Sequence, residues 1–202
     1  LKSELFGVDP HEVRRYVDFT KVRDGILALT GRLFGVSYVP VDAPAWHADV
    51  EAYDVVEDGE RLGRIFLDMH PREGKYGHVA CFPLVDGLRD RHLPEAALVC
   101  NFPRGLMTFD DLLTFLHEFG HLVHAIFSGR VTHARLAGLS EQGEWDFVEA
   151  PSQLLEEWGW THEVLRDFAT DADGNPINIA AIVVWQVADT AKSVFAVEEF
   201  EE

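Results

Sequence analysis

The sequence is poor in basic residues. Its 202 residues contain 17 Lys and Arg against 35 Asp and Glu, which gives a formal net charge of −18. A surface of this charge repels phosphate groups and anionic lipid headgroups, so neither a nucleic acid nor a membrane is expected as a partner. The acidity favours solubility and by itself predicts no catalytic role.

Cysteines and long apolar runs are also scarce. Cys81 and Cys100 are the two cysteines, and both lie in apolar segments, where buried thiols are expected rather than a disulfide. No stretch approaches the roughly 18 apolar residues that span a bilayer, and no signal-peptide pattern opens the chain. The chain is 47% hydrophobic, so we expect one domain or part of one. The default expectation for its compartment is the cytoplasm. The sequence gives no prediction of its oligomeric state.

The apolar pattern predicts helices first and strands next. Apolar residues at helical spacing indicate a helical segment over 1–35 that ends at Gly35. Residues 36–105 indicate a small antiparallel or mixed sheet with a hairpin turn at Asp58 and Gly59. The candidate strands are 36–40, 50–57, 62–69, 78–85 and 96–102.

A pair of helices is predicted over 106–168. The first runs from about 109 to 128, because Thr108 and Asp111 form a capping-box pattern. The second runs from about Asp146 to 168, with Pro151 either in its first turn or at a kink. A last helical segment is predicted over 177–202. The expected fold class is therefore mainly α with a small β-sheet.

A motif on the first of these two helices predicts a metal site. His117 and His121 are four residues apart, so both imidazoles lie on one helix face and can share one small cation. Zinc favours imidazole and carboxylate ligands. Glu118 projects beside such a metal, where it can accept a proton from water. The alternative is an ordinary helix with two surface or core histidines.

Catalytic zinc normally takes three protein ligands and a water. His124 lies on the same helix, but three ligands in line would cover about 10 Å of helix axis, too far for one ion. The third ligand must come from another element, and the available carboxylates are Glu141, Glu144, Asp146, Glu149, Glu156 and Glu157. Two antiparallel helices could bring Glu149 to the histidines, with Glu156 on the same face to orient one of them. Each carboxylate could equally belong to a solvated helix face.

Three segments together resemble the M3 family of zinc oligopeptidases, the thimet oligopeptidase group. They are HEFGHLVH at 117–124, DFVEAPSQLLE at 146–156 and GRIFLDMHPREGKYGHVACF at 63–82, in the order of the family. The resemblance is close over about 60–160 and diffuse elsewhere. Full-length members are several times longer, so this chain resembles a central piece of their catalytic domain.

The resemblance implies a site with one zinc ion. His117, His121 and Glu149 would be its ligands, and Glu118 would be the general base. The implied fold is a zincin-like metallopeptidase core, partial in this chain, beside a deep channel that admits short peptides. The implied function is zinc-dependent endopeptidase cleavage of short oligopeptides.

Further residues are expected to border this site. Glu156, His124 and Asp146 would support the ligands without contacting the metal. Gly138, His78 and Tyr76 are candidate substrate contacts. Ala137-Gly138, in the loop 129–145, stands where members often have Ser-Gly, and His78 and Tyr76 belong to the turn after the third candidate strand. One edge of the sheet could pair with an extended peptide. Arg72, Glu73 and Lys75 are expected to form a solvated turn.

Two alternative functions stay open. Members of the family carry a downstream His- and Tyr-rich stretch that helps to stabilise the tetrahedral intermediate, whereas no Tyr follows Tyr76 in this chain. The chain could therefore be a catalytically silent zinc-binding fragment. It could also act as a peptidyl-dipeptidase, an exopeptidase of the same family, because related zinc peptidases share the His-Glu-x-x-His motif and a downstream Glu.

Overall fold

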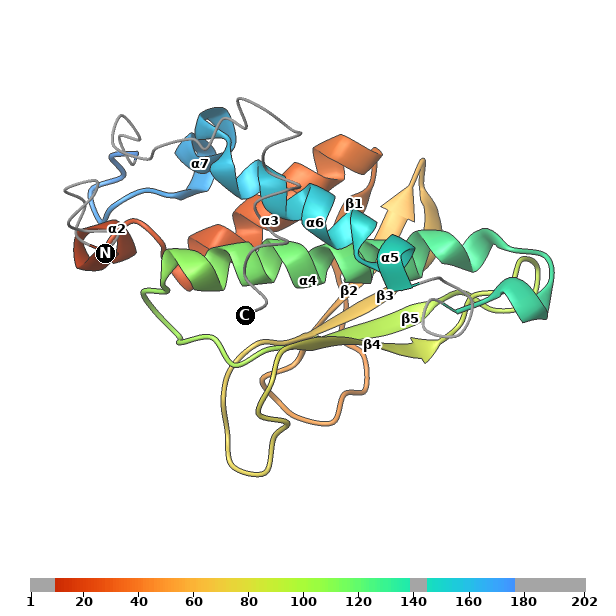
Figure 1. The fold of residues 1–202 in the computed structure, drawn as a ribbon. Coiled ribbons are helices and arrows are strands. Elements are labelled where there is room, and N and C mark those ends of the chain that lie inside the picture. The colour runs from red at the N-terminus through yellow and green to blue at the C-terminus, as the bar shows by residue number, and fades with distance from the viewer. Residues whose placement is uncertain (1–9, 139–144, 177–202) are drawn as a thin grey trace, which may run out of the picture.

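The computed structural model describes residues 10–138 and 145–176. The predicted helical segment 177–202, and Glu141 and Glu144, lie outside these residues. The strands are β1 Ser37–Pro40, β2 Glu51–Glu57, β3 Glu60–Asp68, β4 Ala80–Val85 and β5 Glu95–Val99 (Figure 1). The α-helices are α2 Pro10–Arg14, α3 Phe19–Phe34, α4 Phe109–Phe127, α5 Trp145–Val148, α6 Ala150–Glu156 and α7 His162–Phe168, with 3-10 turns at Ser128–Arg130, Ala134–Leu136 and Glu157–Trp160.

The strands form one mixed sheet in the order β1-β2-β3-β5-β4. β3 and β5 pair in parallel, and β4 runs antiparallel to β5 along one edge. The turn between β2 and β3 contains Asp58 and Gly59, both with positive φ (50° and 85°), as a tight two-residue hairpin requires. The predicted mixed sheet is confirmed, and each of its strands lies within a few residues of its predicted position.

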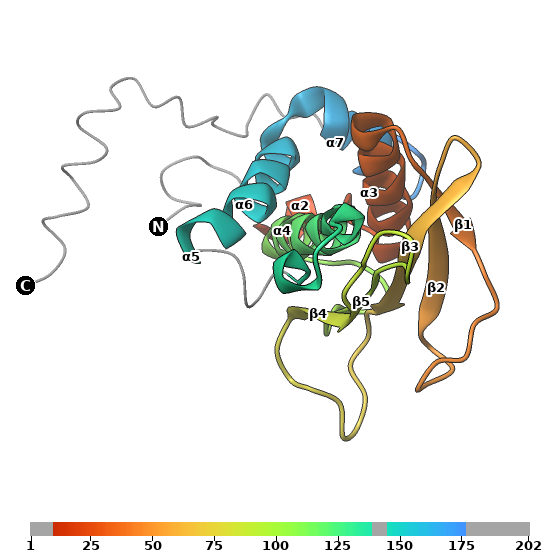
Figure 2. The same cartoon turned by 90° about the vertical axis from the view of Figure 1, so that its right-hand side faces the viewer.

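Helices cover one face of the sheet. α3 and α4 lie against that face, and α6 lies on the side of α4 that faces away from the sheet (Figures 1 and 2). The core lies between α4 and the sheet, where Phe115, Phe119 and Leu122 are fully buried with Leu67 and Leu98 of the central strands. α4 therefore has a partner on both sides, the sheet on one and α6 on the other.

The start of α4 follows the predicted capping box. Thr108 Oγ1 accepts from the backbone N–H of Asp111 at 3.1 Å, and the Asp111 carboxylate accepts from the N–H of Thr108 at 2.8 Å. These reciprocal bonds satisfy backbone donors that have no partner within the helix. Asp110 and Asp111 also place negative charge at the positive end of the helix dipole. The helix that carries the histidines is thus fixed at its first turn.

The prediction of one continuous helical segment over 1–35 is wrong for the described residues. α2 ends at Arg14, and α3 starts after Asp18, whose extended backbone and side chain cap the new helix. Asp18 Oδ1 accepts from the N–H groups of Thr20 and Lys21. The predicted end is confirmed, because Gly35 takes the left-handed conformation (φ 69°) that terminates α3.

The prediction of one helix over 146–168 is also wrong. The segment divides into α5, α6, a 3-10 turn and α7, and Pro151 lies in the first turn of α6, one of its two predicted positions. The 3-10 turn contains Gly159, where a Cβ atom would stand 2.6 Å from the side chain of Leu113 on α4. At Gly159 the chain therefore lies directly against the leucine side chains of α4.

The cysteines agree with the expectation from composition. Cys100 is buried, Cys81 is partly buried and both thiols are free, as predicted. Among residues 10–138 and 145–176, every helix is too short or too polar to cross a membrane.

Gly120 sets the distance between α4 and α6. A Cβ atom at this position would lie 2.5 Å from Ser152 Cα and 2.8 Å from the backbone oxygen of Pro151. These atoms are backbone, so no side-chain rotation could relieve the overlap. A residue larger than glycine would force the two helices apart.

We therefore expect Gly120→Ala to reduce the free energy of unfolding by about 1–3 kcal/mol, the usual cost of overpacking, in a urea titration. The matched control is Gly105→Ala, because nothing lies within 4 Å of a Cβ atom at Gly105. Equal stability of the two variants would show that α4 and α6 do not depend on this close approach.

Candidate metal centre

Two histidines of α4 face α6. His117 and His121 are one helical turn apart, and their ring centroids are 5.1 Å apart at an interplanar angle of 80°. Their side chains are 26% and 15% exposed, so solvent reaches both rings. The structure therefore places the two imidazoles on one helix face, as predicted.

Glu149 lies opposite these rings, immediately before α6. Its Oε2 atom is 3.2 Å from His117 Nε2 and 3.2 Å from His121 Nε2. Ser152 Oγ lies 2.9 Å from the same Oε2 and 2.7 Å from the backbone oxygen of Glu149, so these two acceptors share its single proton. Ser152 is fully buried, so this hydroxyl holds the carboxylate in a fixed direction.

His117, His121 and Glu149 form a group that could hold one metal ion, since one ligand atom from each lies within 4.8 Å of the others. The spacing can be compared with a known geometry. Two ligand atoms bound at about 2.0–2.1 Å to a tetrahedral zinc lie about 3.3 Å apart. Both nitrogen–oxygen distances in the group, 3.2 Å, match that edge. These two edges are therefore compatible with a small tetrahedral cation, and the remaining edge, between the two imidazole nitrogens, is within 4.8 Å.

Glu156 contacts the other nitrogen of one of these rings. Its Oε2 atom is 3.2 Å from His117 Nδ1. A carboxylate there accepts the Nδ1–H proton, which leaves Nε2 with its lone pair directed toward Glu149. The predicted role of Glu156, to orient a histidine from behind, agrees with this contact.

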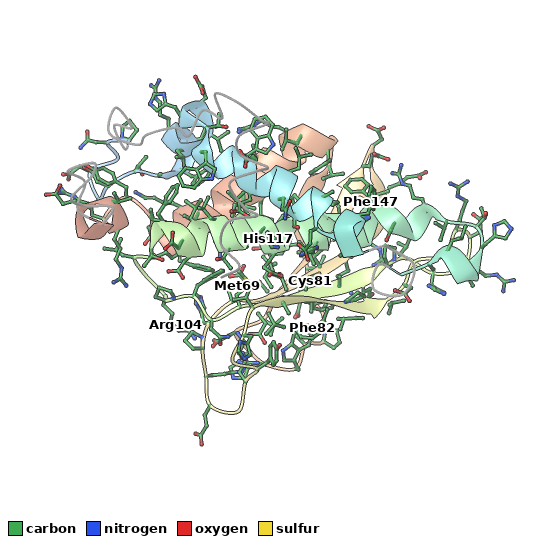
Figure 3. The ribbon with its side chains drawn as sticks, in the orientation of Figure 1. Met69, Cys81, Phe82, Arg104, His117 and Phe147 are labelled. Atoms are coloured by element: carbon green, nitrogen blue, oxygen red, sulfur yellow. The ribbon has the colours of Figure 1, made fainter. Side chains whose placement is uncertain are left out.

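Glu118 projects from α4 in a different direction from the histidines. The backbone of Cys81 on β4 lies near enough to the Glu118 carboxylate to influence its pKa, and Figure 3 shows Cys81 between β4 and α4. Burial raises the pKa of the Glu118 carboxyl, against the lowering influence of His121 and His117. The carboxylate is thus held between the histidine group and the edge strand of the sheet.

His124 does not join the group of possible metal ligands. Its ring stacks edge-on against Phe147 of α5, with centroids 6.3 Å apart, and burial lowers its pKa. Its Nδ1 atom is buried without a hydrogen-bond partner among the described residues. These contacts agree with a packing role. Asp146 belongs to α5, but its side chain lies outside the described part of the structure.

The three candidate substrate contacts are divided between two places. Gly138 has a positive φ (93°), and a Cβ atom there would lie 3.1 Å from the carboxylate of Asp86, the residue that follows β4. Tyr76 and His78 lie in the loop between β3 and β4, where Tyr76 packs on His78 and on Phe82. Figure 3 shows Phe82 on the side of β4 that faces away from His117. The structure therefore brings Gly138 to one end of β4 and does not bring Tyr76 or His78 to the histidine group.

Two contributors to the site were not predicted from the sequence. Ser152 holds the Glu149 carboxylate, and the only sequence signal is a serine three residues after a glutamate at the start of a helix. The backbone of Cys81 on β4 lies beside the Glu118 carboxylate, and this proximity depends on how the sheet packs on α4. A residue spacing along one element carries no information on that packing.

Comparisons with known proteins agree with this geometry. The family model described as Peptidase family M3 matches residues 1–191. Thimet-like oligopeptidase of Dictyostelium discoideum is 38% identical over 79% of this chain and 25% of its own length. Saccharolysin of Saccharomyces cerevisiae is 34% identical over 83% of this chain and 26% of its own length.

Oligopeptidase A of Escherichia coli is 33% identical over 81% of this chain and 26% of its own length. The chain thus spans about a quarter of the length of these relatives. The family match covers nearly the whole chain and includes the segment with the histidine and glutamate group. The chain belongs to peptidase family M3.

Proposed function

We propose that this chain carries the zinc centre and the general base of a metalloendopeptidase that hydrolyses short oligopeptides, within a partial zincin-like core. The observation that carries the proposal is the convergence of His117 Nε2 and His121 Nε2 on Glu149 Oε2, each at 3.2 Å. Two neutral imidazoles and one carboxylate are a known ligand set of catalytic zinc and leave the fourth position open.

Zinc held by these three residues would polarise the scissile carbonyl and lower the pKa of a water toward about 7. Glu118 accepts the proton of the attacking water and delivers it to the leaving amine. Its pKa is raised by burial, which makes the carboxylate a stronger base than one on the open surface. Glu156 and Ser152 contact the ligands rather than the substrate, and they hold His117 and Glu149 in place.

The substrate is a peptide in extended conformation that pairs with β4. This strand forms one edge of the sheet, and its burial falls from partial at Ala80 and Cys81 to exposed from Phe82 onward. A peptide added along such an edge gains main-chain hydrogen bonds without requiring a particular sequence. Cys81 places the strand beside Glu118, and Gly138 lies at the other end of β4. A peptide on β4 would therefore pass the metal group.

Catalysis by this chain alone is expected to be weaker than that of a protein of the relatives' full length. The described residues around Glu118 and Glu149 include no donor assigned to the oxyanion of the intermediate. The loss of one such donor costs about 2.7–4 kcal/mol of transition-state stabilisation. A catalytically silent zinc-binding fragment is the second candidate, favoured by the observation that the chain spans 25–26% of its relatives.

Zinc affinity should depend on Glu156 although this residue is not a ligand. We expect Glu156→Ala to weaken zinc binding by about 10–100-fold, because His117 loses the carboxylate that fixes its ring and tautomer. The measurement is competition with a chromogenic chelator on the purified chain. Glu157→Ala is the matched control, since Glu157 is the neighbouring acidic residue and points to solvent. An equal effect of both changes would contradict the orienting role of Glu156.

Glu118→Gln should separate metal binding from chemistry. We expect this variant to keep the zinc affinity of the wild-type chain and to lose about 10²–10⁴-fold in the rate of cleavage of an internally quenched oligopeptide.

Products from peptides with free and blocked C-termini distinguish endopeptidase from peptidyl-dipeptidase cleavage. Equal rates of wild type and variant would remove Glu118 from the mechanism. A wild-type chain that is loaded with zinc but shows no turnover would favour the silent fragment.

A further inference from the structure

The loop 69–79 joins β3 to β4 and is anchored by one buried lysine. The Lys75 side chain is only 2% exposed, so the predicted solvated turn is wrong at this residue. Its ammonium donates to the backbone oxygens of Asp68 at 2.8 Å and His70 at 2.7 Å and to that of Cys100. It also lies 2.9 Å from Asp68 Oδ1. An ammonium has three protons, so these oxygens satisfy all of its hydrogen-bonding capacity.

The counter-ion of Lys75 is the Asp68 carboxylate, and hydrogen bonds fix it as well. The Asp68 carboxylate is buried and accepts from both terminal nitrogens of Arg72, at 2.6 and 2.8 Å, and from Trp46 Nε1 at 2.8 Å. Burial favours its neutral form, but the hydrogen bonds from Arg72, Trp46 and Lys75 outweigh burial and hold the pKa of Asp68 well below its usual range. The Asp68 carboxylate and the Lys75 ammonium are therefore a buried ion pair in which every polar atom has a partner.

These contacts join the loop to the ends of two neighbouring strands. Asp68 is the last residue of β3, and Cys100 directly follows β5, which is parallel to β3. The next residue, Asn101, donates through Nδ2 to the backbone oxygens of Tyr76 and His78, both at 3.0 Å. The loop 69–79 leads directly into β4, which begins at Ala80. The next residue, Cys81, lies beside the Glu118 carboxylate. The position at which β4 begins is thus set by Lys75 and Asn101.

A buried ion pair of this kind contributes little net stability compared with apolar residues of similar volume. Its directed bonds do restrict geometry, because four oxygens around one ammonium admit one arrangement of the loop. Lys75 contacts neither His117, His121 nor Glu149 among the described residues, so any effect on the site is indirect and passes through the strands that the lysine joins.

We propose that Lys75 is a positioning residue for the substrate strand: it fixes the start of β4 relative to Glu118 and thereby sets the affinity for peptide. The proposed metal ligands come from α4 and from the residue just before α6, so we expect zinc affinity to be independent of Lys75. This inference rests on the proposed function, in which a peptide pairs with β4.

A second lysine of the chain offers a matched control. Lys21 also donates to backbone oxygens, those of Thr170 at 3.1 Å and Asp171 at 2.7 Å, and to the Thr170 hydroxyl at 2.7 Å. It ties α3 to the segment after α7, which does not touch β4 in either view of the fold (Figures 1 and 2). Lys75→Met and Lys21→Met remove the same group from the same kind of carbonyl cage in two places.

The test compares these variants in three measurements on the zinc-loaded chain: amide hydrogen exchange, zinc affinity, and the binding of a fluorescein-labelled oligopeptide in the Glu118→Gln background. For Lys75→Met we expect amides of 80–85 to exchange about tenfold faster and the peptide to bind about tenfold more weakly, with exchange in α4 and zinc affinity unchanged. For Lys21→Met we expect β4 exchange and peptide affinity to stay at the wild-type values.

Two results would overturn the proposal. One is unchanged exchange of β4 and unchanged peptide affinity in Lys75→Met. The other is an equal rise of exchange in α4 and β4 together with weaker zinc binding, which would make Lys75 a general stabilising residue. If Lys75→Met does not fold, Asn101→Ala takes its place with the same expected and contrary results, because it loosens the same loop without leaving a buried charge. A wild-type chain that binds zinc but no peptide would instead refute the proposed function, and the exchange data alone would then decide the role of Lys75.

Discussion

The close contact between α4 and the first turn of α6 is the feature on which the site depends. Gly120 lets the backbone of Pro151 and Ser152 approach so near that a single additional carbon atom would overlap with them. Glu149 is the residue that immediately precedes this turn, so the approach brings its carboxylate to 3.2 Å from both imidazoles. If the two helices were wider apart, the histidines would face solvent with no third ligand. The metal group is thus a consequence of helix packing as much as of residue type.

α4 supplies two kinds of side chain to two different neighbours. His117 and His121 face α6, where Glu149 and Glu156 lie. Glu118 is rotated by about 100° from His117 on a helix of 3.6 residues per turn and meets the sheet at Cys81. A buried helix between a sheet and a second helical layer can serve both sides at once. The proposed base therefore lies on a face of α4 next to that of the proposed metal ligands, toward β4.

Much of this arrangement could be predicted from the sequence, because the relevant signals are local. The spacing of His117 and His121, the capping box at Thr108 and the hairpin turn at Asp58-Gly59 each depend on a few adjacent residues. Glu156 follows from the same reasoning, since it lies two helical turns after Glu149 and reaches the Nδ1 atom of His117. Periodicity along one element was sufficient in each of these cases.

The rest depends on contacts between elements that are distant in sequence. The apolar pattern of 146–168 does not show how this segment divides into α5, α6 and α7, because the pieces are positioned by contacts with α4, such as that of Gly159 with Leu113. Lys75 stands in a polar turn and resembles a solvated residue, yet backbone oxygens of β3 and the residue after β5 surround it. Tyr76, which directly follows that lysine, packs on His78 and on Phe82, and Phe82 lies on the face of β4 away from His117. The division of 146–168, the burial of Lys75 and the position of Tyr76 and His78 all depend on how distant segments of the chain pack together.

The atoms that bind the metal can be measured directly by X-ray absorption at the zinc edge of the zinc-loaded chain. The proposed ligands, His117, His121 and Glu149, predict only nitrogen and oxygen neighbours at about 2.0–2.1 Å, with the multiple scattering of two imidazoles. A sulfur neighbour at about 2.3 Å, which Cys81 or Cys100 would have to supply, would contradict this ligand set. So would a folded chain that takes up no zinc.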